Sequence, residues 1–225
     1  MLNYFEKIKE YKHFLLLAVW PVLLLFFFYC EKTVVAKYKM HCVFDDGIPL
    51  IKWFIIPYEL WYIYLAAGFL FLGLKSKKDF VALCVLLYAG HMISYFFYLL
   101  FPNGQDLRPV IIGKDILSNM IRHLYSIDTP TNVFPSLHVY DSIIVFITSK
   151  NYLQEHKKYG ILAGSFVIMV MASISTVFVK QHSVLDILGG IALAIAVYYL
   201  FCKCEANFKT RLRPGAKMSS THLSS

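Results

Sequence analysis

Long apolar stretches are the feature of this sequence that most constrains its fold. Six stretches are long enough, or nearly so, to cross a membrane, since a helical span needs about 20 mostly apolar residues. The fourth is the shortest, and we retain it because clear spans flank it and a strongly polar segment leads into it. The sequence therefore predicts an all-α, polytopic membrane protein with six transmembrane helices. The expected spans are residues 14–30, 48–74, 80–101, 137–148, 159–179 and 184–202.

Composition supports a membrane protein and excludes several other classes. Hydrophobic residues make up 58% of the 225 residues and charged residues 16%, whereas a soluble domain is nearer half apolar and a quarter charged. These values exclude a disordered chain, a disulfide-stapled small protein and an ordinary cytosolic enzyme. We expect a single integral-membrane domain over residues 1–225, with its motif-bearing core at roughly 80–202 and a polar tail at 203–225.

The basic residues are distributed unevenly among the predicted loops. Of the 22 Lys and Arg residues, 14 fall in the N-terminal segment, the loops after spans two and four, and the tail, and only seven in the other loops. Cytoplasmic loops carry the excess of Lys and Arg in membrane proteins. We therefore expect a multi-pass protein of the cell membrane with both termini in the cytoplasm. The net charge of +8 then reports orientation, and no nucleic-acid partner is expected.

The most unusual polar residues gather on the less basic side, which this count places outside. Pro135 and Ser136 lead into the fourth span, where a proline can open a helix and free amide groups suit an anion. His138 follows within the first turn. His182 and Asp186 are four residues apart at the start of the sixth span and would share a helix face. A carboxylate can hold one imidazole nitrogen and leave the other free to react.

Two cations accompany these residues. Arg108 follows the third span and offers a planar fork that fits phosphate oxygens, and Lys180 precedes His182 by two residues. Each feature also has a structural reading: a headgroup contact for Arg108, a snorkelling Lys180, an interfacial His138, and a His–Asp pair that only joins two helices. Together, however, they form a set suited to phosphoryl transfer, with cations for the phosphate, a nucleophile with its orienting carboxylate, and a second histidine as acid.

These motifs, in this order, resemble the type 2 phosphatidic acid phosphatase superfamily of integral-membrane enzymes. The family pattern is Lys, six residues, Arg-Pro; then Pro-Ser-Gly-His; then Ser-Arg, five residues, His, three residues, Asp. Arg108-Pro109 matches the end of the first part, but Phe101 occupies the lysine position. Leu137 replaces the glycine of the second part, and Thr176 replaces the arginine of the third. These last two changes are similar to the inositol-phosphorylceramide synthase branch.

The resemblance implies a haloperoxidase-like helical bundle and a metal-independent lipid phosphatase or phosphotransferase that needs no cofactor. In that family's scheme His182 is the nucleophile that forms a phosphohistidine, and Asp186 orients it. His138 protonates the leaving lipid oxygen. Arg108 and Ser136 bind the phosphate. The expected partner is a membrane lipid phosphate or pyrophosphate that reaches the site from the outer leaflet.

Several alternatives remain open at the level of sequence. We hypothesise that Lys180 replaces part of the two missing cations. Water as acceptor would make the enzyme a phosphatase, whereas a lipid alcohol would make it a phosphotransferase, including one of the inositolphosphotransferase type. A non-catalytic lipid-binding or transport protein on the same scaffold is a further alternative. A metal held by His138, His182 and Asp186 is disfavoured, because nearby Arg and Lys suit a bound anion better.

Four other features carry expectations. The apolar spacing of residues 115–127 predicts a short helix on the outer surface, either a lid or an inert interfacial element. His91, in the middle of the third span, is expected to form an interhelix hydrogen bond, and a substrate-lining role is the less favoured alternative. Asp141 is expected to face the bundle without a catalytic role. Cys30 and Cys42 could pair on the outer side, although nothing in the sequence demonstrates it.

Overall fold

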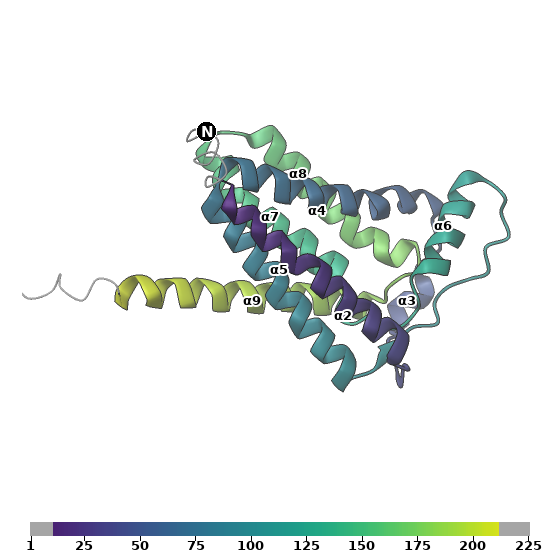
Figure 1. Ribbon diagram of the computed structural model, residues 1–225. Coiled ribbons are helices and arrows are strands. Elements are labelled where there is room, and N and C mark those ends of the chain that lie inside the picture. The colour runs from purple at the N-terminus through teal and green to yellow at the C-terminus, as the bar shows by residue number, and fades with distance from the viewer. Residues whose placement is uncertain (1–10, 212–225) are drawn as a thin grey trace, which may run out of the picture.

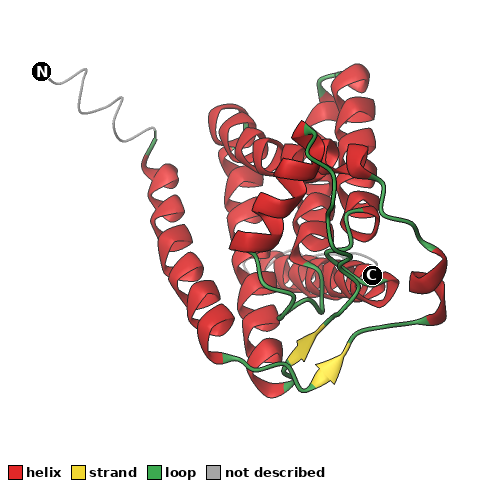
Figure 2. Ribbon diagram, turned by 90° about the vertical axis from the view of Figure 1, so that its right-hand side faces the viewer, coloured by secondary structure: helices red, strands yellow, loops and turns green. Residues whose placement is uncertain are grey.

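The computed structural model describes residues 11–211, and helices account for most of them (Figures 1 and 2). Two very short strands join loops at one end of the bundle (Figure 2). In chain order the elements are η1 Lys12–Val19, α2 Trp20–Thr33, β1 Tyr38–Lys39, α3 Val43–Gly47, η2 Lys52–Phe54, α4 Ile55–Lys75, α5 Lys77–Leu100, β2 Asn103–Gly104, α6 Ile116–Ile127, α7 Leu137–Glu155, α8 Tyr159–Phe178 and α9 Val184–Arg211.

Within residues 11–211, five helical segments are long and apolar enough to cross a membrane, which makes this a multi-pass membrane protein. They correspond to the first, second, third, fifth and sixth expected spans. The second begins at Lys52 rather than at residue 48, because residues 48–51 are not helical and the Ile51 amide donates to the carbonyl of Phe178. The five segments are Lys12–Thr33, Lys52–Lys75, Lys77–Leu100, Tyr159–Phe178 and Val184–Lys209.

Helix α7 corresponds to the fourth expected span, but it is not among these five segments. It is longer than expected, since it continues past residue 148 to Glu155. Polar side chains such as Asp141, Ser142 and Ser149 are buried along it and lower its hydropathy. It packs against α4, α5, α8 and α9. Length and hydropathy alone therefore identify five spans rather than six.

Small residues allow the helices around α7 to approach closely. Tyr140 is fully buried, and its hydroxyl donates to the carbonyl of Leu86 on α5 over 2.5 Å. A Cβ at Gly90 would lie 2.0 Å from the Tyr140 ring, so only glycine leaves room for that ring. On α4, a Cβ at Gly68 would lie 2.8 Å from Val145. Close packing through glycines is typical of membrane helix interfaces.

The two ends of the bundle differ in construction. Helices α3 and α6 lie at one end, which we call the site end, and the start of η1 and the end of α9 lie toward the other (Figure 1). Helix α6 confirms the prediction of a short helix at residues 115–127. Its buried residues Ile121 and Leu124 pack against Ile55 and Tyr58 of α4, so α6 closes the site end of the bundle.

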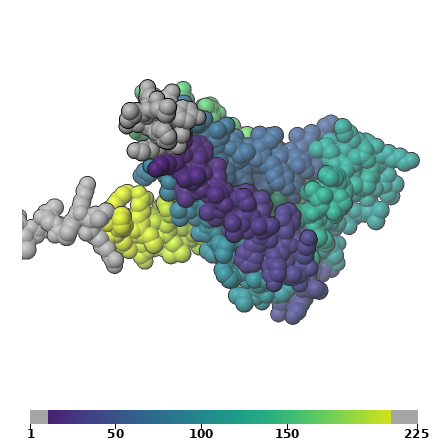
Figure 3. Space-filling model, viewed as in Figure 1, coloured from purple at the N-terminus to yellow at the C-terminus, as the bar shows by residue number. Residues whose placement is uncertain are grey.

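Backbone pairing holds the loops of the site end together. The parallel strands β1 and β2, which the sequence did not predict, join the loop after α2 to the loop after α5. Gly104 also bridges Thr131, which leads toward α7. Across the face shown in Figure 3, η1 and α2 lie over α5. The two strands and the helices η1 and α2 therefore lie around the segment 135–138, which carries the second sequence motif.

One further expectation needs correction. Helix α9 continues through residues 203–211, the first part of the expected polar tail, and residues 212–225 lie outside the described residues. Cys30 is buried within α2 and Cys42 precedes α3, and both are free thiols. The possible Cys30–Cys42 disulfide is therefore wrong for this structure.

Candidate functional site

The turn between α8 and α9 presents His182. Lys180 has a left-handed backbone with φ 57°, typical of a residue that ends a helix. The amides of Gln181 and His182 then both donate to the carbonyl of Thr176. Ser183 begins α9 as its N-cap, since its hydroxyl accepts from the amide of Leu185 at 3.2 Å. His182 therefore lies in a tight turn just before the helix rather than on the helix itself.

Asp186 holds both the turn and the histidine. Its Oδ2 accepts from the Ser183 amide at 2.8 Å, so the third helical residue reaches back to the N-cap as in one half of a capping box. The same oxygen lies 3.2 Å from Nδ1 of His182. Because Nδ1 is engaged, Nε2 is the nitrogen available for chemistry. Asp186 is fully buried, so the pair is shielded from solvent.

The start of α7 brings His138 to the same place. The Ser136 amide donates to the backbone carbonyl of Asp186 at 3.1 Å, which links the two sequence motifs directly. A Cβ at Gly190 would lie 2.6 Å from the carbonyl oxygen of Ser136, so a glycine there lets α7 begin against α9. The ring centroid of His138 lies 6.1 Å from that of His182. The two imidazoles therefore face a common space.

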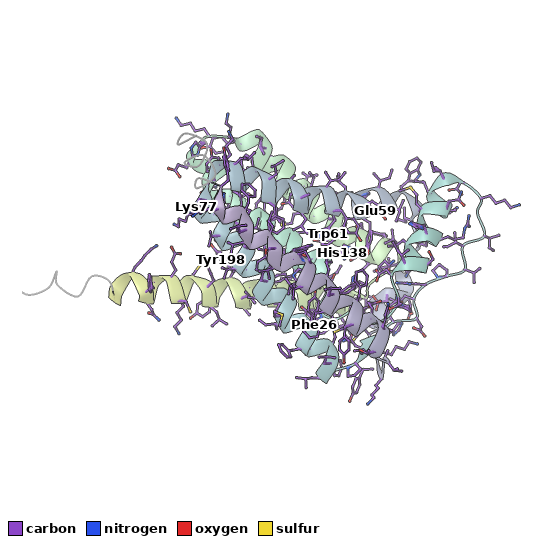
Figure 4. The ribbon with its side chains drawn as sticks, in the orientation of Figure 1. Phe26, Glu59, Trp61, Lys77, His138 and Tyr198 are labelled. Atoms are coloured by element: carbon purple, nitrogen blue, oxygen red, sulfur yellow. The ribbon has the colours of Figure 1, made fainter. Side chains whose placement is uncertain are left out.

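Aromatic rings of α4 fix the His138 side chain. Its ring stacks on Tyr58 at 4.6 Å and lies 4.1 Å from the ring of Trp61. Figure 4 shows Trp61 and His138 side by side in the middle of the bundle. Nε2 of His138 is buried and has no hydrogen-bond partner among the described residues. This nitrogen is therefore free to exchange a proton with a ligand.

Both histidines line a cavity of about 330 Å³ at the site end. That volume lies within the range of small-molecule pockets, which is about 300–1,000 Å³. Apolar and aromatic side chains from α2, α4 and α5 form much of its wall, as suits a lipid. The aromatic lining residues are Trp20, Phe27, Phe28, Trp61, Tyr62, Tyr95 and Tyr98, and the polar ones besides the two histidines are Glu31, His91, Asp128, Thr129, Thr131, Asn132 and Gln181.

Arg108 stands one side chain behind the cavity wall. Its guanidinium donates to the carbonyls of Asp128 at 2.8 Å and Thr129 at 3.1 Å, and to the side-chain oxygen of Gln181. It also lies over the ring of Tyr125 at 4.7 Å. Burial lowers the pKa of Arg108, and the carboxylate of Asp128 acts against this shift. Because an arginine stays charged even so, a positive charge is held beside the residue that precedes His182.

The other two expected phosphate ligands differ in placement. The Ser136 hydroxyl is buried and has no hydrogen-bond partner within residues 11–211, whereas the Ser136 amide donates to the backbone carbonyl of Asp186. The Lys180 ammonium instead donates to the backbone carbonyl of Asp45 at 3.0 Å, and Lys180 is not among the cavity-lining residues. The structure therefore brings together His182, Asp186, His138, Ser136 and, through Gln181, Arg108. It does not bring the Lys180 ammonium into that group.

Phe101 and Thr176 occupy the two positions at which the family pattern has a cation. Phe101 stacks on Tyr38 of β1 with ring centroids 4.1 Å apart. The hydroxyl of Thr176 donates to the carbonyl of Ser173 within α8. Both side chains are thus part of the local packing.

Sequence reasoning missed two carboxylates of the cavity wall. Asp128 follows α6 and accepts no hydrogen bond from any described residue; burial, with the nearby charge of Glu31, raises its pKa to about 6. Glu31, near the end of α2, accepts hydrogen bonds from the loop after α6. Neither stands in a motif or at a helical spacing from the histidines. Only the folded chain places them at the site.

A second buried His–Asp contact lies deeper in the bundle. His91 bonds through Nδ1 to the carbonyl of Leu87 in its own helix, so the expected interhelix hydrogen bond is wrong. Its Nε2 instead lies 3.6 Å from Asp141 on α7, beyond hydrogen-bond distance. Asp141 faces the bundle as expected and is fully buried. Among the residues that the structure describes, no three His, Cys, Asp or Glu side chains gather as a metal-ion site.

The fold and the site together indicate the class of protein. Membrane-length helices surround a largely apolar cavity that holds an oriented histidine, a second histidine and a nearby arginine, which describes a membrane phosphatase-like protein. Residues 105–209 match the family model of the PAP2 superfamily, and this range contains all the expected site residues. The match covers slightly less than half of the chain and supports the PAP2 superfamily. No curated protein and no solved structure matches the chain.

Proposed function

We propose that this chain is a PAP2 enzyme that transfers the phosphoryl group of a membrane lipid phosphate or pyrophosphate through a phosphohistidine on His182. One observation carries the proposal. Nδ1 of His182 is held by the buried Asp186 while His138 faces the same cavity with a free nitrogen. A nucleophile, its orienting carboxylate and a separate acid are the parts that covalent phosphoryl transfer requires. A lipid-binding or transport protein has no need of that set.

The reaction would proceed in two displacements. Nε2 of His182 attacks phosphorus, the bond from phosphorus to the lipid oxygen breaks, and His138 gives that oxygen a proton. An acceptor oxygen then attacks the phosphohistidine, its proton passes to His138, and the phosphorus–nitrogen bond breaks to restore His182. Asp186 stabilises the imidazole each time it carries positive charge. At the end of the cycle both histidines are back in their starting states, and the phosphoryl group has moved from the lipid oxygen to the acceptor oxygen.

Hydrogen-bond donors for the phosphate would come from the start of α7 and from Arg108. The amide of Tyr140 is the first to bond back to the carbonyl of Ser136, so the amides before it in the first turn lack partners within the helix. Such a helix start attracts anions. The unpartnered Ser136 hydroxyl adds a donor. Arg108 would supply the charge, once its contact with Gln181 rearranges toward the phosphate.

Helix α7 is proposed as the sixth span. Its 19 residues are about 28 Å long at 1.5 Å per residue, close to the hydrocarbon thickness of a bilayer. It begins at the site end with His138, and α8 returns to the site end before His182. Because η1 begins and α9 ends toward the opposite end (Figure 1), an even number of crossings fits the chain better than five. The helices packed around α7 would shield its polar residues from lipid.

The charge distribution of the sequence supports an outward-facing site with cytoplasmic ends. Native cysteines provide the test, because Cys42 lies at the site end whereas Cys202 and Cys204 are exposed on α9. In single-cysteine variants in sealed right-side-out vesicles, an impermeant maleimide should label Cys42 without detergent and the α9 thiols only after lysis. The reverse pattern would place the active site on the cytoplasmic side.

A purified-protein assay tests the enzymatic proposal. Phosphate or phosphoryl transfer from mixed lipid phosphates is measured for the wild type and for His182→Ala. The wild type should turn over lipid and the variant should not. Equal activity in both would leave a lipid-binding or transport protein as the better reading. Supplying water alone, diacylglycerol or ceramide as acceptor then separates a phosphatase from a phosphotransferase.

One observation favours the transferase as the second candidate. Leu137, which replaces the family's glycine and is similar to the inositolphosphotransferase branch, lines the cavity. A leucine beside His138 adds apolar wall where an acceptor lipid would approach, and so favours a lipid alcohol over water. Leu137→Gly should then raise the ratio of hydrolysis to transfer. An unchanged ratio would remove this support for the transferase.

A further inference from the structure

The charge of the cavity wall is unexpected for a site that binds only phosphate. Among the described lining residues there are two carboxylates, Glu31 and Asp128, and no Lys or Arg. Arg108 stands behind the wall and donates to the backbone carbonyl of Asp128 rather than to its carboxylate. A ligand that offered only a phosphate would add a third negative charge to this poorly solvated space, with a single arginine to offset it.

The hydrogen bonds distinguish a supporting carboxylate from an open one. Both oxygens of Glu31 are occupied: one accepts from the amide and hydroxyl of Thr129, the other from the side-chain amide of Asn132 at 3.1 Å. Asp128 accepts no hydrogen bond from any described residue. The side-chain oxygen of Asn132, which is 5% exposed, is also buried without a partner. The wall therefore offers the carboxylate of Asp128 and the side-chain oxygen of Asn132, and neither accepts a hydrogen bond from a described residue.

From this wall we propose that Asp128 and Asn132 bind the ammonium group of a phospholipid headgroup, so that the natural donor is a zwitterionic phosphodiester of the aminoalkyl type. A primary ammonium supplies N–H donors to both acceptors. The aromatic rings of Trp61 and Tyr62, which line the same cavity, favour a cation further. This inference rests on the proposed phosphohistidine chemistry of His182, and it makes the donor a phosphodiester rather than a phosphate monoester or pyrophosphate.

Charge balance favours an ammonium over a neutral polyol such as inositol. Asp128 and Glu31 repel each other, and an incoming cation relieves that repulsion. A zwitterionic headgroup also brings its own compensation for the phosphate charge. A polyol could donate hydrogen bonds to Asp128 and Asn132, but it would leave the carboxylates and the phosphate uncompensated. The ammonium is therefore the occupant that the wall fits best.

The corresponding step is a balanced transfer. His182 attacks the phosphorus of the diester, the bond to the diacylglycerol oxygen breaks, and His138 protonates that oxygen. The aminoalkyl phosphate stays on Nε2 of His182 while Asp128 holds its ammonium. The oxygen of an acceptor hydroxyl or of water then attacks phosphorus, the phosphorus–nitrogen bond to His182 breaks, and the proton of the acceptor passes to His138.

The test compares headgroups on one protein. Full-length protein is reconstituted into vesicles that contain phosphatidylethanolamine, phosphatidylinositol, phosphatidylglycerol or phosphatidic acid, and the formation of diacylglycerol is measured. We expect kcat/KM to be highest for phosphatidylethanolamine. Asp128→Asn should reduce its advantage over phosphatidylglycerol by about 10- to 100-fold, the effect of losing a hydrogen bond between charged groups. Asp106→Asn, an exposed carboxylate paired with Lys39 outside the cavity, is the matched control and should leave the ratio unchanged.

The outcomes separate the inference from the function on which it rests. Diacylglycerol formation that is no faster from phosphatidylethanolamine than from the other lipids, or a ratio that Asp128→Asn does not alter, would overturn the ammonium subsite and leave the enzyme intact. Diacylglycerol formation from none of the four lipids would count against the proposed function. Binding of soluble phosphoethanolamine, compared with glycerol phosphate by calorimetry, tests the subsite without turnover. Equal affinity for the two would again overturn it.

Discussion

Nδ1 of His182 lies 3.2 Å from Oδ2 of Asp186, and that same oxygen caps helix α9 through the amide of Ser183 at 2.8 Å. The backbone carbonyl of Asp186 also accepts from the amide of Ser136 at the start of α7. One residue therefore orients the proposed nucleophile, closes the first turn of its own helix and fastens the segment that carries the second histidine. The geometry of the whole site depends on this residue.

His138→Gln tests the proposed role of a general acid. General acid catalysis contributes about 10²–10⁴-fold, and the need for it depends on how poor the leaving group is. Turnover of a lipid phosphate should fall by about that factor, whereas an aryl phosphate, whose leaving oxygen needs no proton, should lose far less. Rates for both substrates are compared in the same preparation. An equal loss for both would mean that His138 positions the ligand rather than protonating it.

Gly190→Ala tests the contact between α7 and α9. The new Cβ would lie 2.6 Å from the backbone oxygen of Ser136, which cannot rotate away, so α7 must shift. Overpacking of this kind costs about 1–3 kcal/mol, and activity should fall with it. Gly164→Ala in α8 is the matched control, because nothing lies within 4 Å of its new Cβ. Thermal unfolding in detergent and lipid turnover are measured for both; equal effects would contradict the packing described here.

Lys180→Ala distinguishes a bracing role from a phosphate-binding role. The Lys180 ammonium donates to the carbonyl of Asp45, and this charged hydrogen bond is worth about 1.5–3 kcal/mol. We expect lower stability and a KM for lipid phosphate within about threefold of the wild type. Lys39→Ala, in an exposed ion pair with Asp106, is the control. A large rise in KM at unchanged stability would instead support Lys180 as the substitute for the family's missing cations.

The raised pKa of Asp128 predicts a specific pH dependence of the stability of the folded chain. Its pKa is raised from 3.8 to about 6 by burial and by the charge of Glu31, so the folded chain binds this proton more tightly than the unfolded chain does. Between these two pH values the folded state holds more protons, and stability therefore falls as pH rises through the window. The unfolding temperature of the wild type, minus that of Asp128→Asn, should decrease from about pH 4 to about pH 6. A constant difference would contradict the buried placement of Asp128.

Hydropathy predicted the helices that face lipid more accurately than the helix that is surrounded by protein. The five spans with apolar surfaces could be predicted to within a few residues, apart from the start of α4 and the end of α9. Helix α7 was underestimated because its polar residues, including Asp141, are covered by neighbouring helices rather than by lipid. The strands β1 and β2 have two residues each, too short for any pattern. Tertiary contacts alone produce them.

The sequence likewise predicted only part of the site, because several of its contacts depend on tertiary packing. The spacing of His182 and Asp186 correctly predicted their side-chain contact. However, His182 lies in the turn before α9, where Asp186 also bonds to the Ser183 amide, and not on a shared helix face. The approach of His138 to His182 followed from a resemblance between motifs, since no local pattern relates residues so far apart. The direction of the Lys180 side chain and the exposure of Asp128 to the cavity depend on α3 and α6, whose packing the sequence does not reveal.

Trapping of the covalent intermediate tests the central claim most directly. Protein is mixed briefly with a lipid phosphate labelled on phosphorus and quenched in base, in which a phosphohistidine survives, and a parallel sample is treated with acid, in which it decays. The wild type should carry base-stable, acid-labile label on the peptide that contains His182. His182→Ala should carry none, and Asp186→Asn should label more slowly. Label of equal amount in His182→Ala, or rapid turnover by the wild type without any label, would contradict a phosphohistidine on His182.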